Sequence, residues 1–122
     1  MNFKILFFTF LISLSSYISK AQTDCKNLPR SFKSYNDAVS KVISAKFLYS
    51  DGLSGNFSSW IDKANYYSCD KRNGYLILET SDKQYIHKNV PLDVLYSFKV
   101  AKSKGSYYSK YIRGRYGLQL AN

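Results

Sequence analysis

The sequence predicts a small α+β domain with an N-terminal helix, a small antiparallel sheet of three to four strands, and two C-terminal helices packed on it. All the helices are expected to lie on one face of the sheet. Two observations carry this prediction. Apolar residues recur at helical spacing over residues 35–45 and 91–101. Between these segments, short apolar and aromatic runs alternate with turn-forming residues. The 122 residues, 45% of them hydrophobic, suffice for one packed domain and exclude a multidomain protein.

The first 21 residues have the pattern of a secretory signal peptide. Lys4 precedes an apolar run over residues 5–14, and the small residues Ser19 and Ala21 occupy the third and first positions before the expected cleavage point. The run is about ten residues long, whereas a membrane-spanning helix needs roughly 20. We expect cleavage after Ala21 and export to the periplasm or the extracellular space, with no membrane span remaining. An uncleaved anchor is the alternative, and the polar residues before Cys25 disfavour a lipid anchor.

The expected mature chain is basic and rich in tyrosine. Its 101 residues include 16 basic and 8 acidic side chains, for a formal charge of +8, and eleven of the twelve tyrosines. A single histidine and two cysteines are too few for a four-coordinate zinc site, and the chain lacks a glycine-rich phosphate loop and a nucleophile elbow. The sequence therefore predicts no metal and no cofactor, and no small-molecule substrate is evident.

Both cysteines lie beyond the expected cleavage point. Cys25 and Cys69 are separated by 44 residues. In an oxidising compartment, a lone pair of cysteines is typical of a disulfide rather than of a metal or catalytic site. We expect this disulfide, with two free buried thiols as the alternative.

The N-terminal part is predicted from capping and spacing. Residues 22–33 are polar and are expected to form an extended lead-in. Ser34 and Asp37 resemble a capping box, and the apolar spacing that follows predicts a helix over 35–45. Residues 47–49 are a short strand candidate, ended by a turn-rich stretch over 51–56. We treat residues 34–57 as a helix and strand extension of the domain.

Strands and helices alternate with turns in the remainder. Residues 58–69 are expected to form one strand, and 70–74 a turn. The nearly continuous apolar run over 75–80 predicts the central strand, with 83–87 paired to it. Pro91 favours a helix start, so a helix is expected over 91–101 with Gly105 at its end. A last helix, capped by Ser106, is expected over 106–113.

An ordered set of residues over 58–117 carries a family resemblance. In order and spacing, the matching residues are Ser58, Ser59, Gly74, Tyr85, Val90, Pro91, Phe98, Ala101, Ser103, Gly105, Tyr107, Tyr108, Ile112, Arg113 and Tyr116. This span resembles the KTSC family, which is named for the C-terminal region of some lysyl-tRNA synthetases and also occurs as stand-alone bacterial proteins. The family's central Tyr-any-Tyr motif reads Tyr85-Ile86-His87 here, so His replaces the second Tyr. The resemblance implies an undetermined biochemical role, sometimes suggested to be RNA binding, and no catalytic residue.

The C-terminal segment concentrates uncompensated positive charge. No acidic residue follows Asp93, whereas six Lys and Arg residues do, interleaved with tyrosines. Cations that neutralise acidic groups, beside aromatic faces that stack on bases or sugars, are typical of surfaces that bind anionic polymers. The alternative is a solvated helix face with tyrosines packed in the core. The candidate binding residues are Tyr85, His87, Lys102, Lys104, Tyr107 and Arg113.

Three functional hypotheses follow. The first is a non-catalytic binding module for an anionic polymer, either nucleic acid or acidic polysaccharide. The second is a protein–protein interaction module of the cell envelope or of a secreted complex. The third is an enzyme with His87 as general base, although the sequence supplies no motif that would orient it. Export would keep the protein away from tRNA, so the synthetase context is not transferred.

Overall fold

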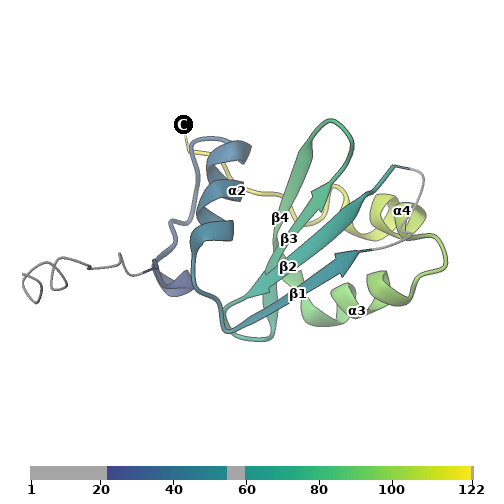
Figure 1. Ribbon diagram of the computed structural model, residues 1–122, viewed down its shortest axis with the longest axis horizontal. Helices are drawn as coiled ribbons and strands as arrows, with labels where there is room; N and C mark the ends of the chain where they lie inside the picture. Colours follow the sequence, from purple (N-terminus) through teal and green to yellow (C-terminus); the bar gives the residue numbers. More distant parts are fainter. Residues whose placement is uncertain (1–21, 55–59, 122) are drawn as a thin grey trace, which may run out of the picture.

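The computed structural model (Figure 1) describes residues 22–54 and 60–121. The predicted signal peptide lies outside these residues, as do Ser58 and Ser59, on which the family resemblance partly rests. The elements in chain order are η1 (Cys25–Asn27), α2 (Tyr35–Ser44), β1 (Tyr49–Ser54), β2 (Lys63–Ser68), β3 (Asn73–Glu79), β4 (Gln84–Pro91), α3 (Leu92–Val100), α4 (Lys104–Tyr107) and the π-helical turn η2 (Tyr108–Ile112). No helix among the described residues is long and apolar enough to cross a membrane.

The four strands form one antiparallel sheet in the order β1-β2-β3-β4, which confirms the predicted α+β class. β3 lies inside the sheet, as the apolar run predicts, and its residues 76–78 are fully buried. β4 pairs with β3 as expected but continues to Pro91, directly before α3.

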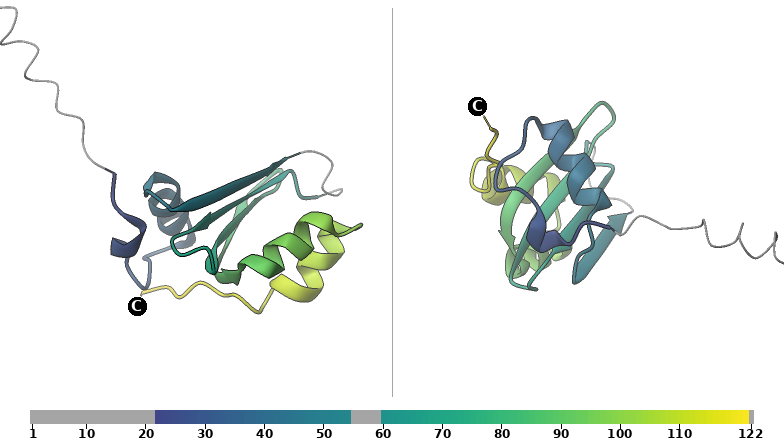
Figure 2. Two further views of the ribbon diagram at one scale, coloured as in Figure 1. Left: turned by 90° about the horizontal axis from the view of Figure 1, so that it is seen from below. Right: turned by 90° about the vertical axis from the view of Figure 1, so that its left-hand side faces the viewer.

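The helices cover both faces of the sheet, so the prediction that they pack on one face was wrong. Leu76 and Leu78 contribute to a core with α3 and η2, whereas Ile77 and Ile86 pack with α2 and Phe32. Figure 2 shows α2 lying apart from α3 and α4. The physical reason is visible in β3 itself, because a continuous apolar run, unlike an alternating one, buries both faces of a strand.

A β-bulge in β4 sets which side chains face the helices. Gly74 pairs with Val90 and Leu76 with His87, so Lys88 and Asn89 together lie opposite Tyr75. Asn89 has a φ of 61°, a left-handed conformation that Asn tolerates better than most residues. The extra residue lets β4 direct both His87 and Val90 toward α3 and η2, which simple alternation would not allow.

The helix α2 forms where its cap predicts, ending at Ser44, one residue short of the expected boundary. The Ser34 hydroxyl accepts a hydrogen bond from the Asp37 N–H at 3.0 Å, and the Asp37 carboxylate accepts one from the Lys33 N–H at 3.2 Å. The first bond satisfies a backbone donor of the first helical turn, as in a capping box, whereas the second reaches Lys33, one residue before the N-cap Ser34.

The first two strands differ from their predicted bounds. Residues 51–54 continue β1 instead of forming a turn, because Asp51 and Gly52 pair with Tyr66 and Asn65 of β2. Such long-range pairing overrides the local turn preference of Asp and Gly. β2 begins only at Lys63, so the predicted strand over 58–69 was too long.

The C-terminal helices also begin and end differently. Pro91 is the N-cap of α3, which ends at Val100. The cap of α4 is Ser103 rather than Ser106, because the Ser103 hydroxyl accepts a hydrogen bond from the Ser106 N–H at 3.2 Å. Gly105 is buried inside α4 and does not end α3.

Residues 113–121, here called the C-terminal tail, run back along the edge of β4 to the lead-in. The Lys88 N–H donates to the Tyr116 carbonyl at 3.2 Å. Further on, the Phe32 N–H donates to the Gln119 carbonyl at 3.2 Å, and the Ala121 N–H donates to the Phe32 carbonyl at 2.7 Å. The tail thus covers part of an otherwise open sheet edge and joins both ends of the domain.

Candidate functional site

A surface pocket of about 360 Å³ lies between the start of β4, α2 and the C-terminal tail. We call it the β4 pocket. Three of the six candidate residues, Tyr85, His87 and Arg113, line it together. The other lining residues are Tyr35, Lys83, Gln84, Ile86, Tyr108, Gly114, Gly117 and Leu118.

His87 forms the inner polar part of this pocket and is only 9% exposed. Its Nδ1 lies 3.2 Å from the Tyr116 carbonyl oxygen, and its Nε2 lies 2.7 Å from the Tyr108 hydroxyl oxygen. Because a carbonyl only accepts, Nδ1 carries the proton and Nε2 accepts from the Tyr108 hydroxyl.

Burial keeps both members of this pair neutral. Desolvation lowers the pKa of His87 below 6.5, although the hydrogen bond to the Tyr116 carbonyl opposes that shift. Desolvation also raises the pKa of Tyr108 to about 12. The hydrogen bond between His87 Nε2 and the Tyr108 hydroxyl joins β4 to η2.

The His87 pair predicts a loss of stability in mild acid. The folded-state pKa of His87 lies below its value in the unfolded chain, so unfolded molecules bind the proton more readily. The free energy of unfolding should therefore fall as the pH drops through about 6.5 toward the folded-state pKa. Urea unfolding at about pH 7.5 and pH 5 measures this decrease.

His87→Gln is the matched control, because glutamine does not titrate while all other charges stay the same. The wild type should lose more stability between the two pH values than this variant. Equal losses in the two proteins would contradict the proposed titration of His87.

Tyr85 and two cations form the outer part of the β4 pocket. Tyr85 faces the same side of β4 as His87, as strand alternation predicts, and Ile86 faces the opposite core. The Lys83 ammonium lies 5.3 Å from the centre of the Tyr85 ring, a cation–π arrangement. With Arg113, the pocket has two cationic lining residues and no carboxylate lining residue.

The remaining three candidates, Lys102, Lys104 and Tyr107, do not line the β4 pocket. The Lys104 ammonium donates to the Ala101 carbonyl at 3.3 Å, at the end of α3. The Tyr107 ring is half-buried and lies 4.8 Å from the ring of Tyr111. Arg113 follows the π-helical turn, whose last bond runs from the Arg113 N–H to the Tyr108 carbonyl at 2.8 Å, and of the four C-terminal candidates it alone lines the β4 pocket.

Sequence reasoning missed two residues that shape the β4 pocket. Tyr35 comes from the first turn of α2, and Lys83 comes from the turn before β4. Neither has a local motif, since the folding of α2 onto Ile77 and Ile86 brings Tyr35 to this side of the sheet. The pairing of His87 with Tyr108 likewise has no signal in the sequence.

One of the C-terminal cations is engaged by the sheet. The Lys99 ammonium on α3 donates to the Asp51 carboxylate at 2.7 Å, and this hydrogen bond raises the pKa of Lys99. The pair joins α3 to the edge strand β1. It removes Lys99 from the set of cations available to a ligand.

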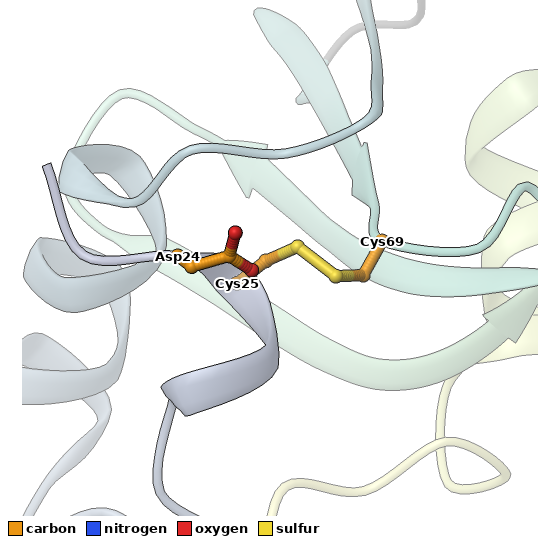
Figure 3. Close-up of side chains that lie close together, drawn as sticks. All are labelled: Asp24, Cys25 and Cys69. Carbon is orange, nitrogen blue, oxygen red and sulfur yellow. A yellow bond between two sulfur atoms is a disulfide. The ribbon is translucent and has the colours of Figure 1, made fainter.

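The predicted disulfide between Cys25 and Cys69 is present (Figure 3). It joins η1 to the turn after β2. The Asp24 carboxylate lies beside the two sulfur atoms, and these three groups are close enough together to ligate one metal ion. Cysteine ligates metals as a thiolate, and sulfurs bonded to each other cannot do so. This group is therefore a structural cross-link.

Searches of protein-family models, of curated proteins and of solved structures gave no match to this chain.

Proposed function

We propose that the protein is an exported, non-catalytic binding module for an anionic polymer, either nucleic acid or acidic polysaccharide. The KTSC-like resemblance of residues 58–117 supports a small binding domain and supplies no catalytic residue. The polymer would lie over α4, η2 and the start of the C-terminal tail, where positive charge is concentrated.

The exposed cations after α3 are the observation that carries this proposal. Lys102, Lys110, Arg113 and Arg115 are all exposed, and no acidic residue follows Asp93. Within the described residues, the ion pairs are Lys41–Asp37, Lys63–Glu79 and Lys99–Asp51, and none of them involves these four cations. Their charge is thus available to a polyanion.

Aromatic rings accompany these cations. The Tyr111 ring is 42% exposed on η2, and the Lys110 ammonium lies 5.3 Å from its centre. Buried Tyr108 and Ile112 fix this turn to the core, so the exposed ring is held on a firm support. Such a ring can stack on a base or on the apolar face of a sugar.

The disulfide supports export, because disulfides form and persist mainly in oxidising compartments. Together with the signal-like first 21 residues, it favours the periplasm or the extracellular space. An exported polymer-binding protein would meet extracellular DNA or acidic polysaccharide rather than tRNA.

Binding to heparin and to a fluorescent single-stranded oligonucleotide tests this proposal. At least one polymer should bind, and its affinity should fall steeply as salt rises from about 50 to about 200 mM. A variant in which four cations are replaced by glutamine should bind at least about tenfold more weakly and show a shallower salt dependence. The replaced residues are Lys102, Lys110, Arg113 and Arg115.

A control variant with the same net charge separates a local surface from a general charge effect. It replaces four exposed cations near the disulfide end of the domain, which are Lys26, Lys46, Lys71 and Arg72. This variant should bind nearly as well as the wild type. Equal weakening of both variants, or no binding to either polymer at low salt, would refute the proposal.

A protein partner is the second candidate function, favoured by exposed apolar side chains near the same helices. Val100 is 81% exposed and Tyr96 is 49% exposed on α3. Exposed apolar groups of this kind are common in protein–protein interfaces. If the protein binds another protein at high salt and Val100→Ser abolishes that binding, a protein partner is favoured over a polymer.

A further inference from the structure

We propose that the β4 pocket is a separate site for a small aromatic anion, that is, a planar ring carrying one carboxylate or phosphate group. This site is independent of the polymer surface proposed above, although Arg113 borders both. Three properties of the pocket carry the inference: its walls, its charge and its size.

The walls favour a ring. Tyr35, Tyr85 and Tyr108 contribute aromatic groups, and Ile86 and Leu118 contribute aliphatic ones. Tyr35 is 53% exposed, and Tyr85 is half-buried, so both rings can contact a ligand. Aromatic rings pack on one another in stacked or edge-to-face geometry.

The inner polar groups of the pocket argue against a sugar. The two ring nitrogens of His87 already bind the Tyr116 carbonyl and the Tyr108 hydroxyl. A ligand with many hydroxyl groups would find few unused partners there, and each unpaired buried hydroxyl would weaken binding. A ring with few polar atoms avoids that cost.

The charge favours an anion. Lys83 and Arg113 line the pocket without any acidic lining residue. Arg113 has no carboxylate partner among the described ion pairs, and a guanidinium binds carboxylates and phosphates through two parallel hydrogen bonds. Gly114 and Gly117 also line the pocket, and a Cβ added at either position would meet no atom within 4 Å, so this part of the wall carries no side chain that would fill the pocket.

The size favours a single small molecule. A volume of about 360 Å³ lies within the range of roughly 300–1,000 Å³ typical of small-molecule sites. One ring with its acidic group fits this volume, whereas a polymer could place only one unit in it.

Calorimetric titration with defined probes tests the proposal. The ring acids are benzoate and phenyl phosphate, which present a carboxylate and a phosphate on the same ring, and the controls are benzamide, which lacks the charge, and cyclohexanecarboxylate, which lacks the aromatic ring. At least one ring acid should saturate below about 10 mM, and both controls should bind at least about tenfold more weakly. Which acid binds tells whether the preferred group is a carboxylate or a phosphate.

Matched variants localise the binding. Arg113→Gln and Tyr85→Leu should each weaken the preferred acid about tenfold or more, whereas Arg115→Gln and Tyr96→Leu should not. The inference is overturned if no ring acid saturates, if a control probe binds equally well, or if the pocket variants bind like wild type. Tyr85→Leu should leave heparin affinity unchanged, so the proposal for the β4 pocket and the proposal for the polymer surface are tested separately.

Discussion

Replacing Cys25 and Cys69 together by serine is expected to lower the free energy of unfolding by about 4 kcal/mol. The disulfide closes a loop of 44 residues, and removing it restores that conformational freedom to the unfolded chain. A loss of this size is a large part of the stability of a domain with about 100 residues. The double variant should therefore unfold at much lower urea concentration than the wild type.

Urea unfolding followed by circular dichroism measures this loss, with and without a thiol reductant. The reductant should destabilise the wild type by a similar amount and leave the serine variant unchanged. Backbone hydrogen bonds from the Cys25 N–H to the Lys46 carbonyl at 3.0 Å and from the Lys46 N–H to the Thr23 carbonyl at 2.8 Å remain available to the variant. A loss below about 1 kcal/mol would show that these bonds, rather than the cross-link, hold the lead-in.

The predictions that succeeded rest on short-range physics. The cap formed by Ser34 and Asp37 defines the start of α2, and Pro91 precedes α3, because both effects act within one helical turn. The strand β3 was found from its apolar run because burial in the sheet interior demands such residues.

The predictions that failed depend on distant partners. Asp51 and Gly52 look like a turn locally, but β2 and Lys99 hold them in an edge strand. The same apolar run that identified β3 also indicates burial on both faces, which the prediction of helices on one face did not use. Tertiary contacts therefore decided both outcomes.

In the candidate site, too, the local pattern predicted some features correctly and the contacts between distant elements decided the others. Tyr85 and His87 are two residues apart on β4 and lie on one face of the sheet, as the alternation of side chains along a strand requires. Grouping Arg113 with Lys102 and Lys104 relied on their closeness in sequence, but only Arg113, which follows the π-helical turn, lines the β4 pocket. Periodicity thus predicts which face a side chain occupies, but not which elements meet there.

Replacing Gly74 by alanine is expected to destabilise the domain by about 3 kcal/mol. A Cβ at this position would lie 2.7 Å from Cζ and 2.9 Å from the hydroxyl oxygen of Tyr66, and it would also collide with the Tyr67 carbonyl. The Tyr66 ring is fully buried and its hydroxyl donates to the Val90 carbonyl at 2.8 Å, so the ring has no space into which to move. The strands β2 and β3 would have to separate locally to admit the methyl group.

Two control variants identify the cause of this loss. Their stability and that of Gly74→Ala are measured by urea unfolding. Gly117→Ala should change the stability by less than about 0.5 kcal/mol, because a Cβ there meets no atom within 4 Å. Tyr66→Phe removes only the hydroxyl and its bond to the Val90 carbonyl, which should cost about 1 kcal/mol. If Gly74→Ala costs no more than Tyr66→Phe, the methyl group only disturbs that hydrogen bond. A larger cost shows that the close approach of the two strands over the Tyr66 ring requires glycine.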